Sequence, residues 1–96
     1  MKYIILDGYL NGTGIRDGAE GGYIELEILN LSSILTKRIR DWIFKYENEF
    51  YNGYSDEKKV EELDNEGQEL VFLLKKELLN TKIEYYSDAK MLKIIV

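Results

Sequence analysis

Hydrophobic residues recur at helical spacing in two long stretches in the middle of the chain. The first follows Ser32, a favourable N-cap residue, and stops at Asn52-Gly53, where glycine can take the left-handed conformation. Its apolar stripe comprises Leu35, Ile39, Trp42, Ile43, Tyr46 and Phe50. The second stretch begins at Ser55-Asp56-Glu57, because acids suit a helix N-terminus. Its apolar face comprises Val60, Leu63, Gly67, Leu70, Val71, Leu74 and Leu78.

The pattern thus predicts two amphipathic helices joined by a short turn. Gly67 lies inside the second, where the missing side chain allows a neighbour to approach closely. Glycine also costs roughly 1 kcal/mol in helix propensity relative to alanine. A break or kink between Asp64 and Gly67 is therefore an alternative to one continuous helix.

Strand-like segments flank the predicted helices. Residues Tyr3 to Leu6 are apolar on both faces, which is typical of a central strand. From Tyr23 to Ile28 apolar and acidic residues alternate, as in an outer strand with one solvent-exposed face. Lys82 to Tyr86 and Met91 to Val96 predict a C-terminal hairpin. We therefore predict a single α+β domain over residues 1–96, of order β-β-α-α-β-β, with a mostly antiparallel sheet of about four strands and both helices packed on one face.

Composition narrows the classes of ligand and compartment. Lysine and arginine number 13 against 18 acids, and the net charge of −5 favours a basic partner over direct binding to nucleic acid. There is no cysteine, which excludes disulfides and thiolate metal sites and suits a reducing cytosol. The first apolar run is too short for a signal peptide, and no run is long enough to span a membrane. We expect a cytoplasmic protein.

Between Asp7 and Gly22 six glycines predict a long loop. Gly12-Thr13-Gly14 could bring backbone amides to a phosphate, but Asp17 stands where the dinucleotide-binding pattern requires its third glycine. A calcium loop starting at Asp7 would lack oxygen ligands at two required positions. We therefore expect a flexible connector and no cofactor, with weak metal binding by Asp17 and Glu20 left open.

The sequence contains few of the residue types that commonly carry out catalysis. Without histidine or cysteine, the nucleophile-histidine pairs and zinc-ligand sets are absent. Paired acids such as Glu47 and Glu49 fall in a charge-rich run that is typical of a solvated helix face. We expect no enzyme, and keep as an alternative a small carboxylate or metal-dependent enzyme that would use Asp7, Asp17 and Glu20.

Negative charge is concentrated in the middle of the chain. Residues 47–69 hold nine acids and two lysines, a balance of −7, while the remainder sums to +2. At 100° per residue, a mixed polar and aromatic row lies opposite the apolar face of the second helix. We take that row and two neighbouring acids as candidate partner-binding residues: Glu61, Glu62, Asn65, Glu69, Phe72, Glu47 and Asp56.

Three aromatic residues, Phe44, Tyr51 and Phe72, point away from the apolar stripes and admit two interpretations. They could widen the buried arc of helices that contact both the sheet and each other. Alternatively, they are anchors of a protein interface rimmed by carboxylates. The pattern alone leaves both open.

A set of residues spanning about two thirds of the chain resembles small bacterial proteins of the toxin-immunity kind. The matching residues are Leu31-Ser32, Leu35, Ile39, Trp42, Tyr46-Glu47, Glu66-Gly67, Leu70, Leu74, Glu77-Leu78 and Glu84-Tyr85-Tyr86. The resemblance stops at Asp7 to Gly22, where those proteins carry an aromatic, proline-containing segment, so the role of this loop stays open.

The resemblance implies an immunity protein that neutralises a cognate toxin domain delivered by neighbouring bacteria, as in contact-dependent growth inhibition. Many such toxins are basic nucleases, and an acidic helical face could cover their active or substrate-binding surface. A second alternative is a phage-type inhibitor or nucleic-acid mimic that acts on a defence enzyme with the same acids.

Overall fold

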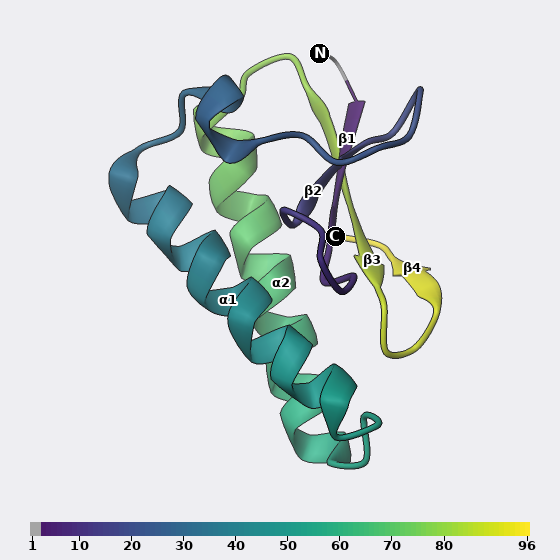
Figure 1. The fold of residues 1–96 in the computed structure, drawn as a ribbon. Helices are drawn as coiled ribbons and strands as arrows, with labels where there is room; N and C mark the ends of the chain where they lie inside the picture. The colour runs from purple at the N-terminus through teal and green to yellow at the C-terminus, as the bar shows by residue number, and fades with distance from the viewer. Residues whose placement is uncertain (1–2) are drawn as a thin grey trace.

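The computed structural model describes residues 3–96 and contains a four-stranded sheet with two long antiparallel helices on one face (Figure 1). In chain order the elements are β1 (Tyr3–Asp7), β2 (Ile15–Asp17), the 3-10 helix η1 (Leu26–Leu29), α1 (Ser33–Tyr51), α2 (Glu57–Glu77), β3 (Lys82–Ser87) and β4 (Leu92–Ile94). The α+β class and the β-β-α-α-β-β order agree with the sequence prediction.

The strands are ordered β2-β1-β3-β4, and the sheet is mixed because it contains parallel and antiparallel pairs. The outer pairs are antiparallel, whereas β1 and β3 are parallel, with Ile4 opposite Ile83 and Leu6 opposite Tyr85. The parallel pair follows from the path of the chain. β2 runs back to the end of the sheet where β1 starts, and α1 and α2, which run in opposite directions, return the chain to that end. β3 therefore starts at the same end of the sheet as β1 (Figure 1).

The prediction of a strand from Tyr23 to Ile28 is wrong. β2 lies within the segment for which the glycines predict a loop, and Tyr23 forms only an isolated bridge with Arg16. The chain then turns into η1, where three residues complete a turn and strict alternation of faces is lost. Leu26 is consequently buried, while Ile28 is 64% exposed.

The predicted starts of both helices and the predicted end of the first helix are confirmed. Ser32 caps α1 by accepting a hydrogen bond from the Leu35 amide at 3.2 Å, and Gly53 follows the helix with a φ of +68°. Asp56 caps α2 by accepting from the Lys59 amide at 3.1 Å. The alternative of a break near Gly67 is wrong, because α2 is continuous.

Aromatic rings join the helices to the sheet. The Trp42 ring lies 5.3 Å from that of Tyr46 and 6.0 Å from that of Tyr85, measured between centroids. Gly67 permits this arrangement, because an added Cβ there would lie 2.5 Å from Cζ of Tyr85. The predicted apolar stripes are buried except at their ends, where Phe50 is 39% exposed and Leu78 is half-buried.

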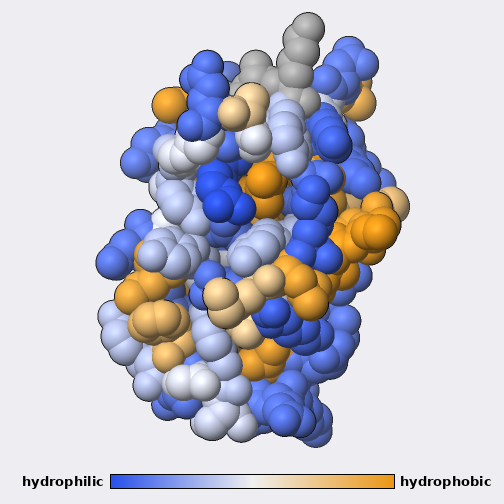
Figure 2. Space-filling view, turned by 90° about the vertical axis from the view of Figure 1, so that its right-hand side faces the viewer, coloured by the Kyte–Doolittle hydropathy of each residue, from blue (hydrophilic) through white to orange (hydrophobic). Residues whose placement is uncertain are grey.

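The opposite face of the sheet carries a mixture of charged, aromatic and aliphatic side chains. Alternation along β1 and β3 directs Tyr3 and Glu84 away from the helices, and Glu84 pairs with Lys93 at 3.1 Å. The Arg16 guanidinium lies over the Tyr86 ring, 5.7 Å from its centroid. Viewed from the sheet side, apolar surface occupies separate areas among polar ones (Figure 2). No helix within residues 3–96 has the length and apolarity needed to cross a membrane.

Candidate functional site

The row predicted on the second helix lies on the solvent side of α2. Glu61, Glu62, Asn65 and Glu69 are exposed, and the Phe72 side chain is 55% exposed. Their spacing places them within one arc of the helix, opposite the buried Val60, Leu63, Gly67, Leu70, Val71 and Leu74. We call this row the α2 face.

The α2 face is less acidic than the local sequence suggests, because bases from distant segments lie beside it. Glu61 pairs at 3.0 Å with Lys90 from the β3–β4 turn, and Glu69 pairs at 3.3 Å with Arg38 from α1. The hydrogen bond that Lys90 donates to the Glu61 carboxylate raises the pKa of Lys90 above its usual value. Within residues 3–96, Glu62 alone among the three glutamates of the α2 face forms no ion pair.

Asp56 and Glu47, the other two candidate partner-binding residues, do not belong to the α2 face. Asp56 is exposed, and its carboxylate is engaged in capping α2. Glu47 is half-buried and accepts a hydrogen bond from the Asn11 amide at 3.0 Å, so it lies on the side of α1 that faces the glycine-rich segment. The structure therefore brings five of the seven residues together.

All three outward-pointing aromatics are exposed. Phe44 is 64%, Tyr51 73% and Phe72 55% exposed, so the interpretation in which they widen the buried arc is wrong. Phe44 and Tyr51 are seven residues apart and therefore share one side of α1, whereas Phe72 lies on α2. They provide apolar contact area on both helices next to charged side chains.

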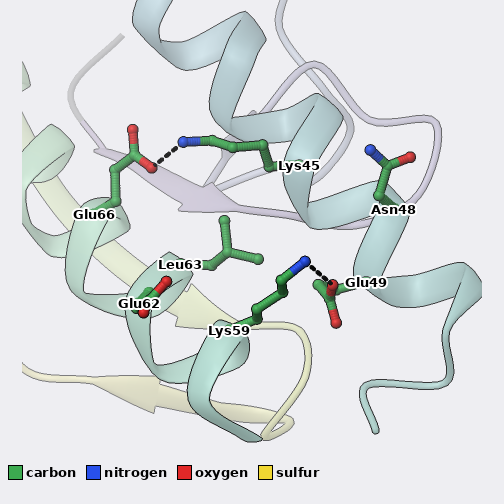
Figure 3. A pocket seen from close by; sticks show the side chains of 7 residues that line it. All are labelled: Lys45, Asn48, Glu49, Lys59, Glu62, Leu63 and Glu66. Carbon is green, nitrogen blue, oxygen red and sulfur yellow. Dashed lines mark hydrogen bonds and ion pairs between the residues drawn. The ribbon is translucent and has the colours of Figure 1, made fainter. Parts of the chain in front are cut away.

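A pocket of about 240 Å³ lies between α1 and α2 (Figure 3). Charged side chains from both helices form its walls, and Leu63 supplies an apolar patch. Its lining residues are Lys45, Asn48, Glu49, Lys59, Glu62, Leu63 and Glu66. Lys45 is bound to Glu66 at 2.7 Å, which closes one side of the pocket with an ion pair. We call it the interhelical pocket.

Glu49 is the unusual member of this pocket. The residue is 3% exposed, yet its Oε2 has no hydrogen-bond partner within residues 3–96, and its Oε1 lies 3.9 Å from Nζ of Lys59. Burying a charged oxygen without a partner is costly. The expectation of a solvated Glu49 is wrong, and helical spacing could have revealed this, because Glu49 follows the buried Trp42 by seven residues.

Asp64 is a second buried acid, on the inner side of α2, and both of its carboxylate oxygens accept hydrogen bonds. The residue is 1% exposed and accepts hydrogen bonds from Tyr46 at 2.9 Å, Tyr85 at 2.6 Å and Ser87 at 2.8 Å. Burial raises the pKa of Tyr46 to about 12 and that of Tyr85 further, so both hydroxyls stay protonated and donate. The cluster of Asp64 with these three hydroxyls, the Asp64 cluster, links α1, α2 and β3.

Asp7, Asp17 and Glu20 do not converge. Asp7 is buried beside Arg16 at 3.3 Å and the Tyr23 hydroxyl at 2.6 Å, and burial raises its pKa. Asp17 lies opposite Ile4 in the sheet, and Ile4 is three residues, or about 10 Å, from Asp7 along β1. Within residues 3–96, no three acids are close enough together to hold a metal ion.

The glycine-rich segment is tied to the domain by its backbone. The Asp7 amide donates to the Gly14 carbonyl at 2.9 Å, and the Thr13 hydroxyl donates to the Ile24 carbonyl at 2.6 Å. Asp17 Oδ1 accepts from the amides of Ala19 and Glu20, which closes the turn after β2. The segment thus forms the edge of the sheet in place of the open connector expected from its composition.

No family model, curated protein or solved structure matches the chain in the comparisons made. The α2 face and the interhelical pocket beside it are therefore the features on which a functional assignment is based.

Proposed function

We propose that this chain is an immunity protein, a stoichiometric inhibitor that binds a cognate bacterial toxin domain and covers its active or substrate-binding surface. The partner is a basic protein, with a nuclease as the expected class. The observation that supports the proposal is the exposed α2 face, where Phe72 lies one turn from Glu69 with the Lys76 ammonium over its ring, and Glu62 has no ion pair within the described residues. Aromatic residues supply binding energy in interfaces, and a charged rim speeds association.

The chemistry of the chain supports inhibition by occlusion. The net charge is −5, and the sequence has no histidine or cysteine for nucleophilic catalysis. The two acids most deeply buried, Asp7 and Asp64, are engaged by arginine and by hydroxyl groups. The proposal accordingly requires neither a catalytic step nor a cofactor.

A nucleic-acid mimic has less support, because such a protein needs rows of uncompensated negative charge in place of phosphates. On the α2 face, Glu61 and Glu69 are each paired with a base. A face that combines paired charges with an exposed aromatic residue is more typical of a partner-specific protein interface.

The first test is the gene that neighbours this one. We expect it to encode a toxin domain, and we expect the two chains to co-purify as a complex of fixed stoichiometry when they are co-expressed. A neighbouring prophage gene would favour the phage-type inhibitor, and failure to recover a basic partner from the native host would end the immunity proposal.

The second test reverses charges on the α2 face. Glu61, Glu62 and Glu69 replaced together by lysine should weaken toxin binding about 100-fold, from about 1 kcal/mol for each reversed charge. Folding should persist, because all three residues are exposed. The matched control replaces the exposed Glu20, Glu25 and Glu27 by lysine, which makes the same change in net charge away from α2. Equal losses from both triple variants would place the interface elsewhere.

A further inference from the structure

The interhelical pocket holds negative charge that the chain itself leaves poorly compensated. Of its three glutamates, Glu66 is bound by Lys45 at 2.7 Å, whereas Glu49 has Lys59 only at 3.9 Å and Glu62 forms no ion pair within residues 3–96. Glu49 Oε2 is buried with no hydrogen-bond partner among the described residues, and Lys59 approaches Oε1 only to 3.9 Å. A group that supplied positive charge and hydrogen-bond donors here would relieve this cost.

The Lys59 ammonium group lies beside the Glu49 carboxylate but is only weakly held there. Its side chain is 63% exposed and reaches from α2 toward Glu49 on α1 (Figure 3). At 3.9 Å the ammonium is beyond hydrogen-bond distance of the Glu49 carboxylate, and because the lysine side chain is exposed, an arriving cation can displace it into solvent. The site is thus accessible from the surface formed by the two helices.

We propose that the interhelical pocket receives an arginine side chain of the protein partner. The inference rests on the proposed function for the source of that arginine and names the group that the partner inserts. A planar guanidinium carries five donors in a fixed fork and can bond to two carboxylates at once, here Glu49 and Glu62. Leu63 offers an apolar wall for the methylene stem, and the Asn48 amide oxygen offers a further acceptor.

Size and ligand chemistry favour arginine over other occupants. The volume of about 240 Å³ is below the roughly 300–1,000 Å³ of sites for drug-sized molecules, so a single side chain fits better than a larger ligand. A metal ion is disfavoured, because within residues 3–96 no three acids are grouped closely enough to ligate one. A lysine ammonium is strongly hydrated and bonds as a point charge, which makes it a weaker match to two separated carboxylates.

The test uses N-acetyl-arginine methylamide as a probe of the whole protein, followed by two-dimensional amide NMR. We expect saturable shifts at Asn48 and at residues 59–66 and binding at least about fivefold tighter than that of N-acetyl-lysine methylamide. Glu49→Gln and Glu62→Gln should each weaken binding of the arginine probe about fivefold or more. Glu62 is exposed, so its variant folds even where a change at Glu49 disturbs packing.

The matched control is Glu57→Gln, an exposed acid on the same helix outside the pocket, which should leave affinity within about twofold. No saturable shift, equal binding of the lysine probe, or an equal effect of Glu57→Gln would each overturn the inference. A toxin bound with unchanged affinity by Glu62→Gln and Glu49→Gln would overturn it and leave the proposed function standing. Arginine binding at the pocket with no toxin in the gene neighbourhood would support the pocket and count against the immunity proposal.

Discussion

Asp64 and Glu49 are both acids buried between packed elements, but they differ in what surrounds them. Asp64 is 1% exposed and receives three hydroxyl donors, from Tyr46, Tyr85 and Ser87. Glu49 is 3% exposed, and one of its oxygens has no partner within the described residues. Burial is therefore equal, whereas hydrogen bonding is complete at one acid and incomplete at the other. The comparison shows that satisfaction of donors and acceptors, more than burial, separates a structural acid from a candidate binding group.

The difference has a geometric origin. The donors to Asp64 stand on α1 and β3, which are fixed by the core, so the carboxylate is held from three sides. Glu49 has as its nearest base an exposed lysine on a flexible stem. Four changes test this contrast, ordered by the size of the effect on stability.

The largest effect is expected from Asp64→Ala. The variant leaves three buried hydroxyls without their acceptor, and at about 1 kcal/mol or more for each the free energy of unfolding should fall by about 3 kcal/mol. Urea denaturation measures this value. The control, Asp41→Ala, removes an exposed acid paired with Lys37 and should change stability by less than about 0.5 kcal/mol. Similar values for both variants would contradict a structural role of the Asp64 cluster.

Alkaline pH should weaken the same cluster. The folded state holds the pKa of Tyr46 at about 12, above its usual value of 10.0, so the folded protein binds this proton more tightly than the unfolded chain. Stability from Tyr46 is therefore complete below pH 10 and is lost as the pH rises through 12, with about 2 kcal/mol lost on reaching pH 12.

Urea denaturation between pH 8 and pH 11.5 measures this loss. Tyr46→Phe should reduce the slope by the contribution of one hydroxyl, because the pKa of Tyr85 is raised as well, whereas Tyr51→Phe, at a residue 73% exposed, should leave the slope unchanged. An equal slope in the wild type and in Tyr46→Phe would show that this proton is not linked to folding.

Gly67→Ala tests whether the close contact beside the Asp64 cluster is required. Helix propensity alone would stabilise α2 by about 1 kcal/mol, but the new Cβ would lie 2.5 Å from Cζ and 2.7 Å from Oη of Tyr85. Overpacking of this kind should dominate and lower stability by about 1–2 kcal/mol. Thermal unfolding would reveal the sign, with the exposed Asn65→Ala as a control that should not lower Tm. A higher Tm for Gly67→Ala would mean that Tyr85 moves aside at little cost.

The smallest effect, and the one of opposite sign, is expected from Glu49→Gln. Removing a buried charge that lacks a full set of partners should leave the free energy of unfolding unchanged or raise it by up to about 1 kcal/mol. Asp64→Asn is the matched comparison and should lower it by about 1–2 kcal/mol, because the amide has only one oxygen for three donors. Urea denaturation of both variants decides the point, and equal losses would remove the distinction between the two acids.

The sequence by itself determined the helices and the class of the fold. Ser32, Gly53 and Asp56 mark the helix ends through contacts within one turn, and the apolar stripes follow a period that adjacent residues set. The exposed row on α2 follows from the same period. These features are local, so the amino-acid sequence of one chain suffices to predict them.

Only the tertiary structure decided which acids are buried and which groups pair with them. Arg38 and Lys90 neutralise Glu69 and Glu61, and Tyr85 reaches Asp64 from 21 residues away. Helical spacing places Glu49 and Asp64 on the inner faces, but their charge argues for solvent, and the conflict is resolved only by groups from other elements. The strand at Ile15–Asp17 likewise depends on pairing with β1, because its own three residues carry no clear strand pattern. A carboxylate's environment is set by non-local partners, which the order of residues along the chain does not specify.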